Sequence, residues 1–379
     1  MSQPTRERDA IPRITDLLAL IAALPAQARD LVKRLFAIEA AEGVIAPPVE
    51  MEPWLVATFG SVEAALRQRV LRVMNRWTFE GAAFNPLRAR RPISGGGGAP
   101  RANVKERIEA ARGDDFCDPE RRTPAEVFGR VRVGQVSASS NVARADGWHA
   151  VLIFDEHNPL AIDAQGVADL LATTEAWAER VCEIDASARH LFLGWNCLWR
   201  AGASQVHGHA QVTLSAGMAP ARVENWRAAA ERYRRETGEH YFADLAAAYR
   251  ALGLAAEIGL VARFASLTPV KEREILLLTP AGNGLTSIAA TLAQTLRLML
   301  EDLGVQAFNV AVFGPPLGAD ADERWADFPL VARLVDRGDP GSDASDIAAM
   351  ELFGSSVIAS DPFDVARALK GKYAALSGL

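Results

Sequence analysis

The chain has 379 residues, of which 49% are hydrophobic and 23% are charged, so it can bury a large core as two packed units or one duplicated unit. Its net charge of -6 provides no overall basic field for a nucleic acid backbone, and we expect no nucleic acid partner. No apolar run approaches the roughly 18 residues of a membrane span. Three cysteines leave an odd thiol under any pairing, which argues against a disulfide framework. We therefore expect a cytoplasmic protein without membrane contact.

Residues 1–80 are predicted to form a helical extension. Helical spacing of apolar residues over 14–42, interrupted at Pro25, indicates two short helices. A third helix is predicted over 62–77, with Ser61 as its N-cap. A basic cluster follows, and then four successive glycines, Gly95–Gly98. No GKS or GKT sequence follows these glycines, so they favour a flexible loop over a phosphate-binding loop.

A strand, helix, strand pattern then occurs twice. The expected segments are 149–154, 167–184 and 190–196 in the first copy, and 274–280, 287–304 and 308–316 in the second. Asn196 and Asn309 lie in the strand after each helix, but only Asn196 is followed by a histidine cluster. The chain is therefore interpreted as duplicated, with one half that kept the chemistry. Residues 219–262 have helical spacing and are predicted to be connecting helices rather than a site.

The histidine cluster contains His207, His209 and Gln211, spaced two apart. In a strand, this spacing places all three side chains on one face. A small-residue turn that ends at Ser204 lets the backbone approach a phosphate closely and supplies a hydroxyl donor. A neutral imidazole is a competent nucleophile at phosphorus, a second imidazole can orient it or bind a metal, and an amide can hold phosphoryl oxygens. A polar strand face without a catalytic role remains the alternative.

This pattern resembles the histidine-triad superfamily, in the branch typified by galactose-1-phosphate uridylyltransferase. That branch carries an Asn, a Ser eight residues later and then His-x-His-x-Gln, which match Asn196, Ser204, His207, His209 and Gln211 here. The final Gln is typical of the transferases and phosphorylases of the superfamily, whereas its hydrolases carry a third His. The resemblance implies an α+β fold of two fused halves, each an antiparallel sheet with packed helices, placed at 81–218 and 219–379. The second half lacks the catalytic histidines.

The resemblance also implies roles for individual residues. His209 would be the nucleophile, supported by His207, while Ser204 and Gln211 would hold phosphoryl oxygens. Further substrate contacts are implied for four residues: Asn196, Arg88, Arg91 and Glu351. Asp114 and Cys117 stand near the place of the family's CxxC zinc motif, of which only one cysteine remains. A structural zinc site would combine Cys117, His157 and His207 with Asp114; the alternative is a lost metal and an ordinary thiol.

The implied reaction transfers a nucleoside monophosphate from a nucleotide sugar to a hexose 1-phosphate, through a nucleotidyl-histidine. The second half departs from the family because it lacks a His-x-His metal site and has Val357 where a hexose-binding Gln is expected. Two alternatives therefore stay open. One is phosphorolysis of ADP-glucose or of a dinucleoside polyphosphate, and the other is nucleotide binding without catalysis. Related enzymes often form dimers, so a homodimer is the assembly that the resemblance suggests.

Overall fold

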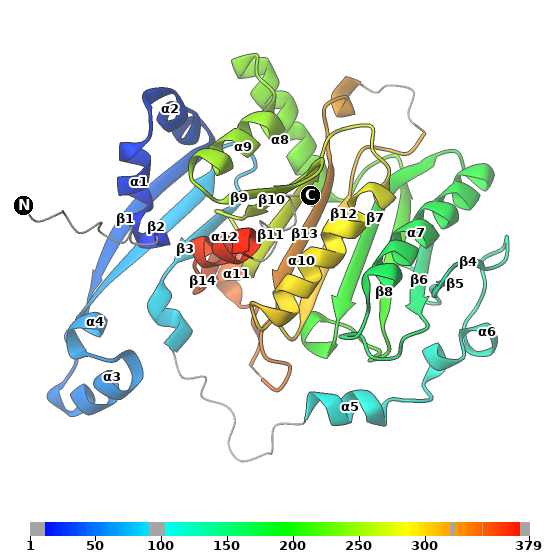
Figure 1. The fold of residues 1–379 in the computed structure, drawn as a ribbon, viewed down its shortest axis with the longest axis horizontal. Coiled ribbons are helices and arrows are strands. Elements are labelled where there is room, and N and C mark those ends of the chain that lie inside the picture. Colours follow the sequence, from blue (N-terminus) through cyan, green and yellow to red (C-terminus); the bar gives the residue numbers. More distant parts are fainter. Residues whose placement is uncertain (1–11, 91–102, 319–322, 343, 372–379) are drawn as a thin grey trace, which may run out of the picture.

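The computed structural model describes residues 12–90, 103–318, 323–342 and 344–371 (Figure 1). Its main feature is a ten-stranded antiparallel sheet with the strand order β4-β5-β6-β8-β7-β12-β13-β11-β10-β9. The strands are β4 (Val131–Val133), β5 (Val136–Ser140), β6 (Trp148–Phe154), β7 (Ala188–Cys197), β8 (His209–Ala216), β9 (Ala255–Ile258), β10 (Val261–Ala265), β11 (Glu272–Thr279), β12 (Phe308–Phe313) and β13 (Leu330–Asp336).

The predicted fold of two fused halves is confirmed, and it is visible in the symmetry of this sheet. The seam lies between β7 and β12, and each half contributes five strands. Counted outward from the seam, the strands of both halves follow the same order: β7, β8, β6, β5, β4 on one side and β12, β13, β11, β10, β9 on the other. The helices α7 (Ala164–Ile184) and α10 (Ala289–Glu301) connect equivalent strands and pack against each other on one face (Figure 1). At the seam, Asn196 pairs directly with Asn309. The two asparagines noted in the sequence are thus neighbours across the junction of the halves.

The alternation of side chains in β7 and β8 creates two different faces. Leu193 and Trp195 of β7 and Val212 of β8 are buried in the core that includes Trp177 of α7. The residues between them in sequence are only half-buried, because they point to the opposite face of the sheet. This second face carries Asn196 and Gln211. The fold therefore buries the apolar residues of these strands under α7 and leaves the polar ones accessible.

A smaller four-stranded sheet, of order β1-β2-β3-β14, is built mainly from the N-terminal region. Its strands are β1 (Phe36–Val44), β2 (Arg67–Asn75), β3 (Gly81–Phe84) and β14 (Ser356–Ile358), and the helices around it are α1 (Leu17–Ala23), α2 (Ala26–Leu35), α3 (Glu52–Phe59) and α4 (Val62–Leu66). The helices predicted on either side of Pro25 are confirmed as far as Leu35. The helical predictions for residues 36–42 and 67–77 are wrong.

The physical reason for this error lies in β2, where alternate residues Leu71, Val73 and Asn75 are buried, a period of two rather than 3.6. Leu71 pairs with Ala40 of β1, far away in the sequence. Such a pairing supplies backbone hydrogen bonds that local apolar spacing cannot indicate. The extension is therefore a β-hairpin with short helices, not a purely helical segment.

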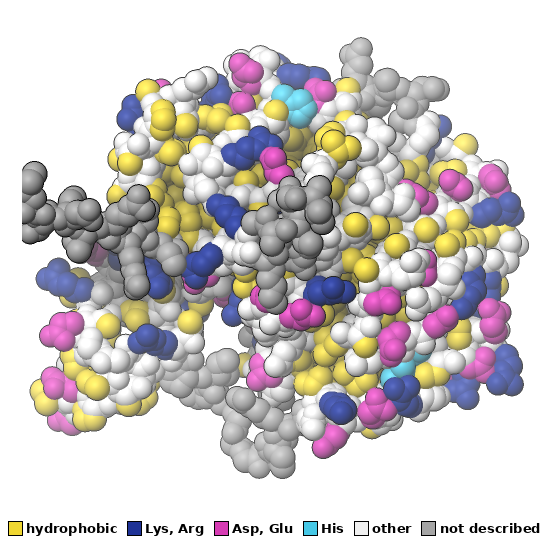
Figure 2. Space-filling model, viewed as in Figure 1, with side chains coloured by type: hydrophobic (Ala, Val, Ile, Leu, Met, Phe, Trp, Pro, Cys, Tyr) yellow, Lys and Arg dark blue, Asp and Glu magenta, His cyan; other side chains and the backbone are white. Residues whose placement is uncertain are grey.

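The other helices are α5 (Val104–Ala110), α6 (Pro119–Arg122), α8 (Ala221–Thr237), α9 (Tyr241–Ala251), α11 (Ala349–Phe353) and α12 (Pro362–Gly371). The helices α8 and α9 confirm the predicted connecting helices, although β9 and the start of β10 also fall in that region. Gly95–Gly98 lie outside the described residues. Within the described part of the chain, no helix is both long and apolar enough to cross a membrane. Figure 2 shows acidic and basic side chains intermingled over one face of the molecule.

Candidate active site

The protonation of His209 is determined by a hydrogen bond to the backbone. Its Nδ1 lies 2.8 Å from the carbonyl oxygen of His207, which can only accept, so Nδ1 carries the proton. The lone pair of the neutral ring is then on Nε2. Burial lowers the pKa of His209 and so favours this neutral form. The ring is only 4% exposed and meets the ring of Phe116 edge-on, at 5.1 Å between centroids. His209 is thus a shielded, neutral imidazole with an unprotonated Nε2.

The expected row of three side chains on one strand face is wrong for His207. β8 begins at His209, so only His209 and Gln211 share a strand face, and His207 lies in the preceding turn. There, Gly208 packs against the segment before His157: its carbonyl accepts from Phe154 N, and its own N donates to His157 O. A Cβ at Gly208 would lie 3.0 Å from Glu156 O. This close backbone contact turns the His207 side chain toward His157 instead of toward the strand face.

A groove with a volume of 570 Å³ lies on the accessible face of the first half. Small-molecule sites are usually about 300–1,000 Å³, so this groove can hold a compound of nucleotide size. Asn196 and Gln211 both line it, and β7 and β8 also contribute Phe192, Gly194, Thr213 and Ser215. His209 itself is not among the lining residues, but it precedes Gln211 by two positions on the same strand face. A ligand in the groove would therefore approach His209 from the side of Gln211.

Positive charge gathers under the turn that precedes the histidines. Arg337 binds Asp346 through two nitrogens, at 2.7 and 2.9 Å, and Lys271 lies 3.7 Å from the same carboxylate. Arg200, in the turn itself, donates to the carbonyl of Arg337 at 3.0 Å. Burial raises the pKa of Asp346, but Arg337 outweighs this effect and holds that pKa below its usual value. Three cations around one carboxylate leave an electropositive region that suits a phosphate ester.

The four residues predicted to bind zinc come together. Their ligand atoms lie within 4.8 Å of one another. Cys117 Sγ is 3.4 Å from Nδ1 of His157 and 3.4 Å from Nδ1 of His207. The two Nδ1 atoms are 3.1 Å apart, and Asp114 Oδ1 is 3.6 Å from His207 Nδ1. Tetrahedral zinc, with bonds of about 2.0–2.3 Å, holds its ligand atoms roughly 3.3–3.7 Å apart.

The hydrogen bonds around this cluster support a cation. His157 Nε2 lies 2.8 Å from Ile108 O and His207 Nε2 lies 2.7 Å from Phe154 O, so both Nε2 atoms carry protons. Two buried Nδ1 lone pairs therefore face each other, and Asp114 Oδ2 is buried without a hydrogen-bond partner. A positive ion would satisfy all three atoms. The residues fit zinc, which would fix the loop of Asp114 and Cys117 against the histidines.

Other predicted residues lie away from this arrangement. Ser204 is exposed in the turn after β7, and Arg88 is exposed in the short helical turn after β3. Glu351 accepts from Ala348 N at 3.0 Å and so caps α11, and it is not among the groove residues. Arg91 lies outside the described residues. The substrate contacts assigned to these residues stay predictions.

Two side chains that contact the groove residues Gln211 and Asn196 were missed in the sequence. His149 of β6 lies 2.9 Å from Gln211 Oε1, and Asn309 of β12 lies 2.7 Å from Asn196 Oδ1. The repetition of Asn196 as Asn309 was the only signal in the sequence for the second contact. For His149 there was none, because its role depends on the pairing of β6 with β8.

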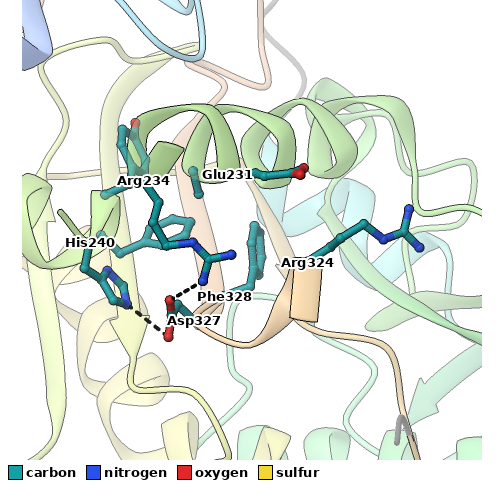
Figure 3. A pocket seen from close by; sticks show the side chains of 9 residues that line it. Glu231, Arg234, His240, Arg324, Asp327 and Phe328 are labelled. Atoms are coloured by element: carbon teal, nitrogen blue, oxygen red, sulfur yellow. Dashed lines mark hydrogen bonds and ion pairs between the residues drawn. The ribbon is translucent and has the colours of Figure 1, made fainter. Parts of the chain in front are cut away.

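A second hollow lies between α8, α9 and the turn before β13 (Figure 3). Asp327 lies between two basic side chains there, 3.0 Å from Arg234 and 4.0 Å from His240. The volume of this hollow is 20 Å³, about the space of one water molecule. It cannot hold a nucleotide, so the groove beside Gln211 is the candidate site.

No protein-family model matches this sequence, and neither does any of the curated proteins. Solved structures do resemble it. An ADP-glucose phosphorylase from Arabidopsis thaliana with bound ADP-glucose is 18% identical, with a TM-score of 0.61, over 79% of this chain and 97% of that chain. This chain therefore shares the fold of that phosphorylase. A galt-like protein from Arabidopsis thaliana is also 18% identical, with a TM-score of 0.57 over 69% of this chain and 92% of the other. A uridylyltransferase is 15% identical, with a TM-score of 0.53 over 65% and 87%. The resemblance inferred from His-x-His-x-Gln is thus confirmed for the fold.

Proposed function

We propose that the chain is a nucleotidyltransferase that carries a nucleoside monophosphate on His209. The observation that supports this most directly is the bond from His209 Nδ1 to His207 O, which leaves the Nε2 lone pair free to attack phosphorus. Two carboxamides, those of Asn196 and Gln211, line the adjoining groove. The positive region around Arg337 favours a phosphate ester nearby.

The reaction has two displacements. In the first, His209 Nε2 forms a bond to the α-phosphorus, the bond from phosphorus to the bridging oxygen breaks, and the distal phosphate ester leaves with the electron pair. In the second, an oxygen of another phosphate attacks the nucleotidyl group, and the electron pair of the N–P bond returns to His209. The leaving group is a stable phosphate, so neither step needs a strong general acid. Gln211 and Ser204 would hold the phosphoryl oxygens.

The composition of the groove supports a neutral distal group on the substrate. Among the described lining residues, Asp146 is the charged side chain, and no Lys or Arg is included. Ser215 and Thr213 supply hydroxyl groups along β8. A polyphosphate chain needs cations along its length, whereas a hexose needs hydrogen-bonding groups. We therefore favour a nucleotide sugar, with hexose 1-phosphate as acceptor, over a dinucleoside polyphosphate.

The test is to incubate the protein with UDP-glucose and, separately, ADP-glucose, each labelled at the α-phosphate, and to measure label on the denatured protein. We expect acid-labile label on the wild type and none on His209→Asn, whose turnover should fall roughly 10⁴-fold or more. The matched control is His240→Asn, because His240 caps α9 through Nδ1 and Asn can also cap. Label on His209→Asn at the wild-type level would refute the proposal.

The acceptor separates the remaining candidates. Phosphorolysis of ADP-glucose is the second candidate, supported by the likeness in fold to the ADP-glucose phosphorylase. With the labelled enzyme in hand, discharge by galactose 1-phosphate but not by inorganic phosphate would indicate a uridylyltransferase-like reaction. Discharge by inorganic phosphate would indicate a phosphorylase, whereas glucose 1-phosphate, the leaving group of the labelling step, discharges either enzyme by reversal. Tight nucleotide binding without label on any protein would instead favour the non-catalytic alternative.

A further inference from the structure

The carboxamide of Asn309 can adopt only one orientation. Its Oδ1 lies 2.6 Å from Arg337 Nη1, which can only donate. Its Nδ2 lies 2.8 Å from the carbonyl oxygen of Ala201, which can only accept. The same Nδ2 lies 2.7 Å from the side chain of Asn196, so the atom of Asn196 that faces it must be Oδ1. The amino group of Asn196 is consequently the part that remains for the groove.

A similar constraint acts on Gln211 from the other side. Nδ1 of His149 lies 2.9 Å from the backbone N of Ala145, which can only donate, so the proton of the neutral ring is on Nε2. Nε2 then donates to Gln211 Oε1 at 2.9 Å. Asn141 Nδ2 lies farther from the same nitrogen, at 3.2 Å, and is itself a donor. The amino group of Gln211 is therefore also left for the groove.

We propose that Asn309 and His149 are positioning residues, which turn the amino groups of Asn196 and Gln211 toward the groove as a pair of donors for one phosphoryl group. Asn196 and Gln211 lie on the adjacent strands β7 and β8, where Gly194 pairs with Gln211. Donors held in advance cost no reorganisation when negative charge grows on the phosphoryl oxygens during transfer. The second half, which lacks the catalytic histidines, thereby orients a group in the site of the first half.

This inference rests on the proposed function, and it predicts a specific result with sulfur substitution. The substrates are UDP-glucose and ADP-glucose and the two α-thio diastereomers of each. Sulfur is a poor acceptor, so the wild type should prefer oxygen at the position that the amino groups contact. In Asn309→Asp, both carboxylate oxygens can only accept hydrogen bonds. Asn196 must then turn its amino group toward residue 309 and away from the groove. We expect kcat/KM for the oxygen substrate to fall roughly 10- to 100-fold. The oxygen-to-sulfur ratio, which is kcat/KM for the oxygen substrate divided by kcat/KM for an α-thio diastereomer, should fall toward 1 for one of the two diastereomers.

Two further variants keep the test decisive if Asn309→Asp unfolds, because Ala201 O would then face a carboxylate. Asn196→Asp keeps the contact with Asn309 and changes only the group toward the groove, so it should lower the same ratio. His149→Leu should do so through Gln211, and His149→Gln, which retains an amide donor, should partly restore it. The control is Asn225→Asp, which makes the same change at an amide that donates to Thr78 O, outside the groove. Thermal unfolding monitors folding in each case.

The outcomes separate this inference from the proposed function. If the wild type forms no nucleotidyl-His209, the proposed function and this inference both fail. If the wild type is labelled but Asn309→Asp and Asn196→Asp keep its oxygen-to-sulfur ratio, the positioning inference alone is wrong. An equal loss of rate with oxygen and sulfur, at an unchanged ratio, would likewise overturn it, because that is the result of a purely structural role.

Discussion

At the scale of single residues, Asp114 decides whether the cluster with Cys117, His157 and His207 can bind a metal. We expect the wild type to purify with about one zinc ion per chain. Asp114→Asn should lower this content, since it removes the anionic ligand, and Asp114→Cys should tighten binding by adding a thiolate. Cobalt substitution provides the measurement, because each thiolate adds charge-transfer absorption, so Asp114→Cys should show about twice the wild-type band. Equal metal content in all three proteins would exclude Asp114 as a ligand.

Phe116, another single residue, covers the ring of His209, the proposed nucleophile. Its ring packs on that of His209. In Phe116→Ala, water reaches the nucleotidyl-histidine more easily, and we expect the ratio of hydrolysis to transfer to rise severalfold. Hydrolysis releases the nucleoside monophosphate and transfer forms a new nucleotide sugar, and both are measured together in the presence of galactose 1-phosphate. Phe79→Ala is the control, because the Phe79 side chain is 61% exposed and far from the site in sequence. An unchanged ratio in Phe116→Ala would show that another group excludes water.

The residues that were predicted from the sequence are those whose role depends on short spacing. His209, Gln211 and Asn196 lie within one segment, and they meet at the groove or directly beside it. His149 and Asn309 were missed because each acts across a strand pairing. Their partners are 62 and 113 residues away in the sequence. Hydrogen-bond direction between side chains is a property of the folded sheet, which residue spacing does not contain.

At the scale of elements, the turn before β8 depends on the absence of a side chain at Gly208. A Cβ there would lie 3.0 Å from Glu156 O and 3.3 Å from Ile162 Cδ1. Gly208→Ala should therefore lower the free energy of unfolding by about 1–3 kcal/mol and weaken zinc binding by separating His157 from His207. Urea unfolding measures the first effect. Gly147→Ala is the matched control, because its Cβ would meet open space. A Gly208→Ala protein as stable as that control would mean that the two segments can separate without cost.

Among the elements, those with a long, uniform pattern were predicted correctly. The amphipathic helices α7 and α10 and the apolar strands β6, β7, β11 and β12 all formed at the expected places. The failures were β1 and β2, whose short apolar segments fit both a helical and a strand period. In β1 most of the residues are exposed, so burial gives no alternation to read. Only the pairing between these two strands, which is not local, determines their conformation.

At the scale of the whole molecule, a buried cluster of charges connects the two sheets. Arg333 of β13 donates to Glu274 of β11 and to Glu80, next to β3, at 2.6 Å each. Burial lowers the pKa of Arg333, but the two carboxylates outweigh this and raise it above its usual value. Replacing Arg333 with Met would leave two buried carboxylates without a cation, at a cost of roughly 3–5 kcal/mol in unfolding free energy. Arg367→Met, which breaks the exposed pair with Asp364, should cost under about 1 kcal/mol.

Removing the charge of Glu274 should not destabilise the fold in the way that removing Arg333 does, because Glu80 alone can balance the charge of Arg333. Burial raises the pKa of Glu274 above its ordinary value of 4.5, although Arg333 opposes this. A carboxyl group with a raised pKa in the folded state stabilises the fold most below pH 4.5, and this contribution is lost as the pH rises through the folded-state pKa. Glu274→Gln cannot ionise. The stability of the wild type minus that of Glu274→Gln should therefore decrease over the pH range above 4.5, measured by urea unfolding. A difference that stays constant or increases over this range would mean that the ion pair with Arg333 keeps Glu274 charged in the fold.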